Sequence, residues 1–170
     1  VIVLYIVFTF NRLISLRNRV DNAWSQIDVQ LKRRYELIPN LIATVKGYMK
    51  HEKGVLTEVT KMRANLVSGS MSEKAKASDA ISNAFKTIFA VAEDYPKLQA
   101  SENFKMLQEE LSGTESKIAY ARQFYNDNVM ALNNGIQQFP SSVIAGILNF
   151  KEREFFKTEE SEKKSVKVEF

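Results

Sequence analysis

The chain has 170 residues, a net charge of +4 and a hydrophobic fraction of 45%, which is enough apolar material for one sizeable core. Six glycines, three prolines and no long alternating strand pattern favour an all-α protein. Because the chain contains no cysteine, disulfides, thiolate catalysis and cysteine-based metal sites are excluded.

The excess positive charge is located in the N-terminal fifth of the chain. Residues 1–34 contain six basic and two acidic residues, and the remaining charges cancel. A nucleic-acid-binding protein would spread basic residues along one face, so we expect no nucleic-acid partner. Basic residues beside an apolar segment are typical of contact with anionic lipid, where each is worth about 1 kcal/mol. The candidate lipid contacts are Arg12, Arg17 and Arg19, with a solvated helix start as the alternative.

The first ten residues, VIVLYIVFTF, are apolar except for Thr9. A helix needs about twenty apolar residues to cross a bilayer. Since the run starts at full hydrophobicity without Met and its charges follow it, residues 1–11 are interpreted as the C-terminal part of a truncated transmembrane segment, not a signal peptide. The arginines that follow predict a single-pass protein of the cell membrane with its bundle on the cytoplasmic side. A buried core helix, or the hydrophobic end of a soluble bundle, is the alternative.

Two rows of residues at seven-residue spacing extend from Val20 to Leu66. The first row is Trp24, Leu31, Ile38, Val45, Glu52, Val59 and Leu66, and the second is Val20, Ile27, Arg34, Leu41, Tyr48, Val55 and Met62. Both rows lie on one helical face, which other helices must cover. Pro39 should kink this helix without ending it, because the rows keep their phase. The phase favours one continuous helix to about Leu66, whereas Gly47 and Gly54 leave a turn near His51 as the alternative.

Two more helices are predicted beyond a loop at Ser68–Ser72. Ser70 and Glu73 form a capping-box pattern for the first of them, which should end before the Tyr95-Pro96 pair. Ser101 can cap the next helix, which should stop by Phe139-Pro140. Its two rows are Phe104, Leu111, Ile118, Tyr125 and Leu132, and Gln108, Glu115, Arg122, Val129 and Ile136.

A last short helix is predicted from Ser141 to about Phe156. Its apolar face consists of Ile144, Ile147, Leu148 and Phe155. Residues 12–156 would form the bundle domain, and residues 157–170 a charged, disordered tail. The predicted fold is therefore all-α: an elongated, antiparallel, up-and-down bundle of about four helices, whose long first helix continues from a membrane anchor.

Three blocks of this sequence resemble the LemA family of bacterial proteins in order and spacing. They are VDNAWSQIDVQLKRRYELIPNLIATVKGYMKHE, YPKLQASENFKMLQEELSGTESKIAYARQFYNDNV and FPSSVIAGILNFKEREFF. The resemblance covers residues 11–156. It implies a single-pass membrane anchor followed by an antiparallel helical bundle, and it implies no established biochemical activity.

Five polar residues occupy row positions that packing alone would fill with Leu or Ile. They are Arg34, Glu52, Gln108, Glu115 and Arg122. A buried charge is costly unless it is paired, so we interpret the set as a core polar network that fixes helix register. Glu115 and Arg122, two turns or about 10 Å apart, could share a partner such as Arg34 on a facing helix. A ligand pocket and exposure to water are the alternatives.

The sequence contains no recognisable catalytic constellation. A di-iron bundle needs Glu-x-x-His pairs, but the single histidine, His51, stands next to Glu52. Neither a serine triad nor a phosphate loop is present. We therefore expect no catalytic residues, no cofactor and no metal, and a non-enzymatic interaction or scaffold module at the bacterial membrane. Its expected partners are membrane lipid through the anchor, and an unknown protein or a second copy. The alternative is a small-molecule or lipid-binding module that uses the core polar network.

Overall fold

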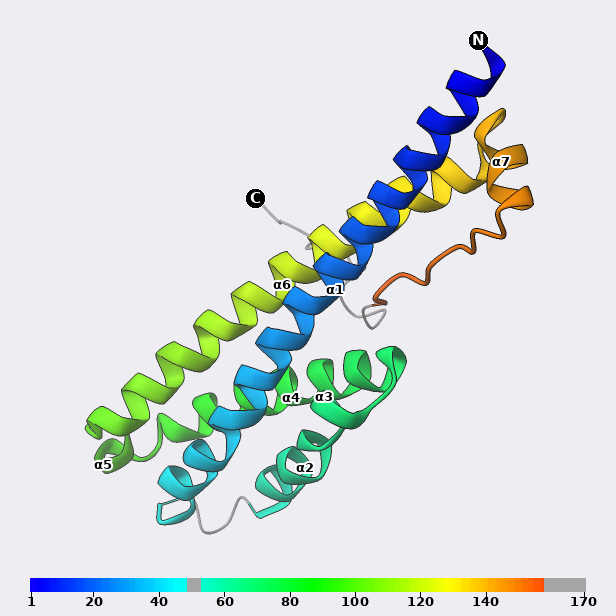
Figure 1. Cartoon of the computed structure of the whole chain (residues 1–170). Coiled ribbons are helices and arrows are strands. Elements are labelled where there is room, and N and C mark those ends of the chain that lie inside the picture. The colour runs from blue at the N-terminus through cyan, green and yellow to red at the C-terminus, as the bar shows by residue number, and fades with distance from the viewer. Residues whose placement is uncertain (49–52, 158–170) are drawn as a thin grey trace, which may run out of the picture. The chain divides into compact units, whose positions relative to one another are not determined.

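The structure is a computed structural model that describes residues 1–48 and 53–157, and it confirms the all-α prediction for these residues. Glu52 and most of the predicted tail lie outside the described residues. The helices, shown in Figure 1, are α1 (Ile2–Lys46), α2 (Lys53–Arg63), α3 (Asn65–Ser68), α4 (Met71–Ala92), α5 (Pro96–Gln99), α6 (Glu102–Gln137) and α7 (Ser141–Ile147). Pro39 lies inside α1 and does not end it, as predicted.

The chain divides into two units, to both of which α1 and α6 contribute. Unit 1 consists of residues 1–28 and 118–156, and unit 2 contains residues 29–117. Each unit has its own buried apolar residues and is described by itself.

In unit 1, the first part of α1 and the last part of α6 run in opposite directions (Figure 1). Their approach is close at Gly135, where an added Cβ would lie 3.2 Å from Leu13 Cδ2. Trp24 is half-buried, and its ring lies 5.6 Å from that of Tyr125. The buried apolar residues of this unit include Leu13, Val20, Ala23, Ile27, Ile118, Ala121, Tyr125, Val129, Leu132, Ile144, Ala145 and Phe156.

The last helix is shorter than predicted, because α7 ends at Ile147 and the chain to residue 157 is not helical. Asn149 adopts the left-handed conformation (φ 54°), and the backbone N–H groups of Asn149 and Phe150 donate to the carbonyls of Gly146 and Ala145 at 3.1 and 2.9 Å. This is the Schellman arrangement that ends many helices, formed here by asparagine in place of glycine. The predicted apolar face of this helix was therefore only partly right, since Ile144 is buried but Ile147, Leu148 and Phe155 are exposed.

In unit 2, α2 and α3 pack against α4, and α4 contacts α5. The buried apolar residues include Leu31, Ile38, Leu41, Val45, Leu56, Val59, Leu66, Ile81, Phe85, Ile88, Leu98, Phe104 and Leu111. The heptad rows therefore identified most core positions on the long helices correctly. The exceptions are Trp24 and Ile136, which are half-buried, the half-exposed Tyr48, and the polar positions considered below.

The prediction of one continuous helix to Leu66 was wrong. Helix α1 ends at Lys46, Gly47 and Tyr48 form a turn, and α2 begins at Lys53. Glycine disfavours helix continuation by about 1 kcal/mol relative to alanine. A chain reversal also lets Val59, which is fully buried, contribute to the core beside α4. Heptad phase cannot distinguish these two outcomes, because the same apolar face is buried in both.

The capping box predicted at the start of α4 is confirmed. Ser70 N–H donates to Glu73 Oε2 at 2.7 Å, and Glu73 N–H donates to Ser70 Oγ at 3.4 Å. These bonds from Ser70 hold the pKa of the Glu73 carboxyl below its usual 4.5. Because the folded state favours the carboxylate, this contribution to stability is present above pH 4.5 and is lost as the pH falls through the lowered pKa.

Replacing Ser70 by alanine is expected to lower the free energy of unfolding by about 1 kcal/mol, because the Glu73 N–H loses its acceptor. Ser72→Ala is the matched control, since Ser72 is exposed in the same helical turn and is not the cap. Urea unfolding followed by circular dichroism measures both variants. Equal midpoints for the two variants would show that the cap contributes nothing.

Candidate functional site

The most deeply buried charge in unit 2 is that of Arg34 on α1, which is 0% exposed. Its Nη1 donates to the Ser78 carbonyl, to Ser78 Oγ and to Ser82 Oγ, each at 3.1 Å. Its Nη2 donates to the carboxylate of Glu115 on α6. The guanidinium therefore links three helices of unit 2, α1, α4 and α6, through protein groups.

Glu115 closes this network on the solvent side, since 45% of its side chain is exposed. Ser82 Oγ lies 2.7 Å from Glu115 Oε2 and donates to the carboxylate. The Arg34 guanidinium carbon also lies 5.8 Å from the centre of the Phe85 ring. The pair thus combines a fully desolvated cation with a half-solvated anion, an arrangement in which the cation depends on its partners more than the anion does.

The structure brings together only part of the predicted five-residue network. Glu52 lies outside the described residues, and Gln108 is half-buried on α6 of unit 2. Arg122 belongs to unit 1, where it is 9% exposed and its guanidinium carbon lies 4.9 Å from the centre of the Phe156 ring. Sequence reasoning missed Ser78 and Ser82 as partners of Arg34, although two hydroxyls one helical turn apart on an apolar face were a usable signal.

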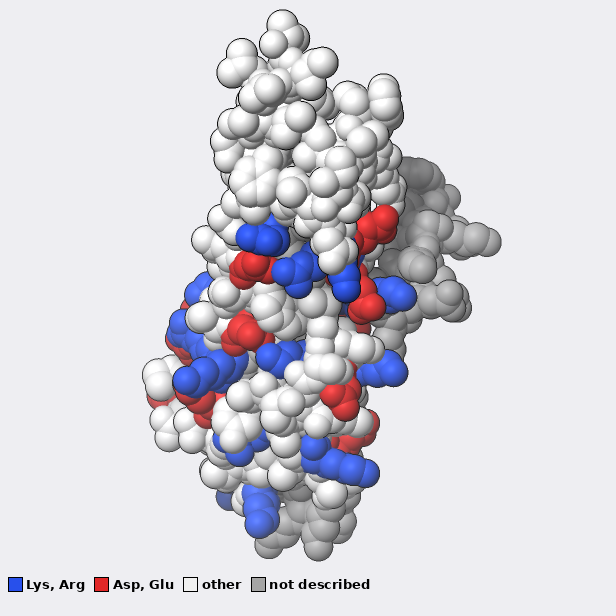
Figure 2. Space-filling view, turned by 45° about the vertical axis from the view of Figure 1, so that its right-hand side comes forward, with Lys and Arg blue, Asp and Glu red and all other residues white. Residues whose placement is uncertain are grey.

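One end of unit 1 is formed by uncharged residues. Neither residues 1–11 nor residues 128–150 contain a charged side chain. Figure 2 shows this end as a region without charged side chains on the face in view, bordered by both basic and acidic residues. Its most exposed large apolar residues are Val1, Ile2, Val3, Leu4, Phe8, Phe139, Val143 and Ile147. Within the part of the chain that the structure describes, no helix has the length and hydropathy of a membrane span.

The three arginines predicted to contact lipid, Arg12, Arg17 and Arg19, are all exposed on α1 just beyond the apolar run. Arg17 lies over the Phe150 ring, with 5.8 Å from its guanidinium carbon to the ring centre. Arg153 donates to Asp21 Oδ1 at 3.0 Å. Unit 1 therefore presents exposed arginines on α1 next to the uncharged end, together with the acidic residue Asp21.

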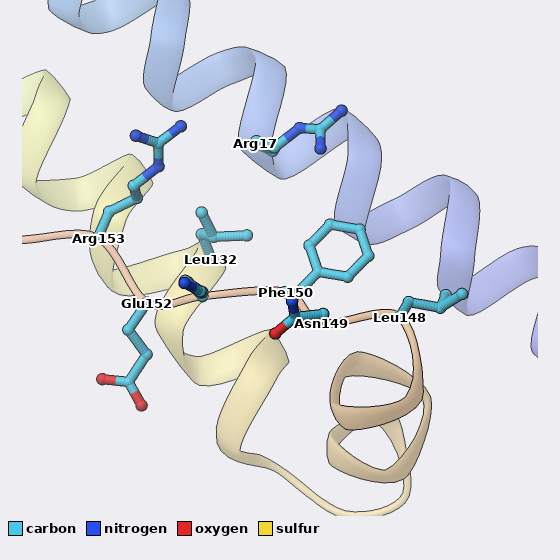
Figure 3. Close-up of a pocket in the computed structure, with 8 residues that line it drawn as sticks. Arg17, Leu132, Leu148, Asn149, Phe150, Glu152 and Arg153 are labelled. Atoms are coloured by element: carbon cyan, nitrogen blue, oxygen red, sulfur yellow. The ribbon is translucent and has the colours of Figure 1, made fainter.

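A partly open cleft of about 400 Å³ lies beside Arg17 (Figure 3). The Phe150 side chain points toward α1, whereas Glu152 points away from it. The lining residues are Arg17, Leu132, Leu148, Asn149, Phe150, Lys151, Glu152 and Arg153. The cleft thus combines guanidinium groups with leucine side chains.

The segment after α7 is held by two asparagines of α6. Asn133 donates to the Arg153 carbonyl at 2.9 Å and accepts from the Arg153 N–H at 2.9 Å. Asn126 makes the same pair of bonds with the Phe156 backbone, at 3.1 and 2.8 Å. Between these clamps, Tyr125 Oη donates to the Glu154 carbonyl at 3.0 Å, and burial raises the pKa of Tyr125. Sequence reasoning missed this segment, because it extended α7 across it.

Among the described residues, no group of three or more His, Cys, Asp or Glu could hold a metal ion. The described residues thus form an all-α protein with long heptad-patterned helices and one uncharged end. Its buried Arg34 bonds to groups on two other helices. The model of the LemA family matches residues 23–170, so the chain belongs to the LemA family, as its three sequence blocks predicted.

The chain is also similar to individual curated proteins. Protein LemA of Metamycoplasma hominis is 26% identical over 92% of this chain and 72% of its own length. Magnetosome protein MamQ of Magnetospirillum gryphiswaldense is 22% identical over 86% of this chain, and Magnetosome protein MamQ 2 of Paramagnetospirillum magneticum is 23% identical over the same share. The chain spans 64% of the length of these MamQ proteins.

Proposed function

We propose that this chain is a non-enzymatic, membrane-tethered helical protein that presents helical faces to a partner protein or to a second copy. The observation that carries the proposal is the uncharged start of α1, whose large apolar side chains from Val1 to Phe8 are exposed. Exposed apolar surface of this extent is unfavourable in water and favourable in lipid. Membership of the LemA family supports the same proposal.

The finer features of the proposal follow from the charges beside the apolar run. Residues 1–11 would be the end of one transmembrane helix, and residues 12–156 an antiparallel, up-and-down bundle. The exposed Arg12, Arg17 and Arg19 support a cytoplasmic position for this bundle at the bacterial cell membrane, since cations are retained on that side.

The described helical surface includes a pair of exposed aromatic residues suited to protein contact. Tyr120 and Phe124, one turn apart on α6, are 75% and 50% exposed. Aromatic side chains contribute much of the binding energy at protein interfaces. We assign this pair as the candidate contact for a protein partner.

In-membrane photo-cross-linking from positions 120 and 124 tests this function. We expect one repeated product, either with another protein or with a second copy. The product from position 120 should disappear in Phe124→Ser and the product from position 124 in Tyr120→Ser, and both should persist in Lys86→Ser, a change at an exposed position on α4. The protein should also stay with the membrane after washing with high salt and carbonate. Release by the wash would contradict the tether, and the absence of any product from intact membranes would contradict the interaction role.

A second candidate is a small-molecule or lipid-binding module. The predicted version, a pocket at the core polar network, would require a ligand to displace the bonds that Arg34 makes with Glu115 and Ser78. The cleft beside Arg17 favours this candidate more directly, because its arginines and leucines suit an amphiphile with an anionic head. If the cross-linking experiment yields no product, the binding of a small molecule or lipid in this cleft becomes the favoured function.

A further inference from the structure

The short helix α7 is apolar on its outer face as well as on its inner face. Ile144 and Ala145 face inward and are 8% and 1% exposed. Val143 and Ile147, one turn apart, are 54% and 78% exposed, and Phe139 just before the helix is 84% exposed. A surface helix of a soluble domain carries polar residues on its outer face, whereas a helix that is apolar all round is typical of an apolar surrounding.

Helix α7 lies alongside the apolar run of α1. Gly135 of α6 packs against Leu13 and Leu16, at 3.2 and 3.5 Å from an added Cβ. Because α6 runs opposite to α1, the residues after Gly135 proceed toward the N-terminus of α1 (Figure 1). Phe139 follows four residues later, which corresponds to about 6 Å along a helix. The turn that carries α7 is therefore level with residues on the N-terminal side of Leu13.

The apolar run of α1 and the segment that contains α7 are each followed by a basic residue. Arg12 is the first charged residue after the apolar run of α1, and Lys151 is the first after α7. The side chains of Arg12 and Lys151 are both exposed. Arg17 lies over the ring of Phe150, the residue just before Lys151. Cations at the edge of an apolar surface suit the phosphates of anionic phospholipids.

We propose that the turn from Phe139 to Leu148 inserts into the same lipid layer as the start of α1, as a second and independent membrane contact. Its occupant is a bilayer that contains anionic phospholipid, with Phe139, Val143 and Ile147 among the acyl chains near the headgroups. The inference rests on the proposed membrane tether, to which it adds a second point of contact. Two contacts separated along the surface fix the tilt and rotation of α1 relative to the membrane, which a single helix does not.

The chain contains no cysteine, so single cysteines can report depth residue by residue. The full chain is labelled with an environment-sensitive fluorophore at Ile147→Cys, Val3→Cys or Gln123→Cys. It is then reconstituted into vesicles of phosphatidylcholine and phosphatidylglycerol in equal parts. A lipid with a nitroxide on its acyl chain near the headgroup serves as quencher. Ile147 and Val3 report the two contacts, and Gln123 is the matched control because it is exposed on α6.

We expect the probes at Val3 and Ile147 to lose about half of their fluorescence or more, and the probe at Gln123 to lose little, since contact quenching requires insertion into the layer. Quenching at Val3 without quenching at Ile147 would overturn this inference and leave the tether standing. Quenching at neither position would overturn both.

A second copy could cover α7 in place of lipid. In that case unlabelled Ile147→Cys would form a disulfide-linked dimer in the vesicles when an oxidant such as copper phenanthroline is added, and a separate labelled sample would stay unquenched; the inference would then be overturned. Because Ile147 is 78% exposed, we expect its replacement to leave the fold intact. Ile147→Asp provides an independent readout, with weaker quenching expected at a probe on Val143→Cys in the same turn.

Discussion

Glu115→Leu is expected to lower the free energy of unfolding by about 2–4 kcal/mol, although nearly half of the Glu115 side chain is exposed. The cost arises at Arg34, whose charge is fully buried and would lose the carboxylate to which its Nη2 donates. The bonds to Ser78 and Ser82 would remain, and they set the lower end of the range. Thermal and urea unfolding followed by circular dichroism measure the loss.

Glu110→Leu is the matched control on the same helix. Glu110 pairs with Arg33 at 2.5 Å, but both side chains are about half exposed, so this pair should contribute less than about 1 kcal/mol. The double variant Arg34→Met/Glu115→Leu should regain most of the stability, because it removes the buried charge together with its partner. Equal, small losses for Glu115→Leu and Glu110→Leu would show that water solvates Arg34 adequately without Glu115.

Phe156→Ala is expected to cost about 3–5 kcal/mol and to shift the fluorescence of Trp24 to longer wavelength. Phe156 is 1% exposed although it lies in a non-helical segment, and its ring centre is 6.0 Å from that of Trp24. Its loss would leave a cavity beside Trp24 and would remove the ring over which Arg122 lies. Since Trp24 is the single tryptophan, its emission reports this site alone.

The adjacent Phe155→Ala is the control for this change, because Phe155 is 43% exposed and its truncation should cost less than about 1 kcal/mol. Similar effects of the two substitutions on stability and on Trp24 emission would mean that the segment after α7 does not pack on unit 1 as described.

The long helices and their buried faces were predictable because heptad spacing is a property of residues close together in sequence. The same spacing at Val20 to Val45 and at Phe104 to Leu132 identified the buried positions, apart from the half-exposed ones, before any tertiary information was used. The end of α1 at Lys46 was not predictable in this way, since the decision between a turn and continuation depends on packing against α4.

The candidate site was predictable only where a charge marked it. Arg34 and Glu115 stood out because a charge on an apolar row is costly and needs a partner. Ser78 and Ser82 carry no charge, and hydroxyls are tolerated on many helical faces. The end of α7 was missed because Asn149 substitutes for the glycine that usually marks a left-handed helix terminus.

The two asparagines on α6 that hold the segment after α7, each of which we call a clamp, fix the number of residues in that segment. Asn126 and Asn133 are one heptad apart, which is about 10.5 Å along a helix. The residues they hold, Arg153 and Phe156, are three apart, which is about 10 Å in extended chain. The spacing of the two asparagines along α6 therefore equals the spacing of the two residues along the extended segment. Both asparagines bond only to backbone groups of that segment. The two residues between Arg153 and Phe156 can therefore be substituted without loss of either clamp, but inserting or deleting a residue there would release one of them.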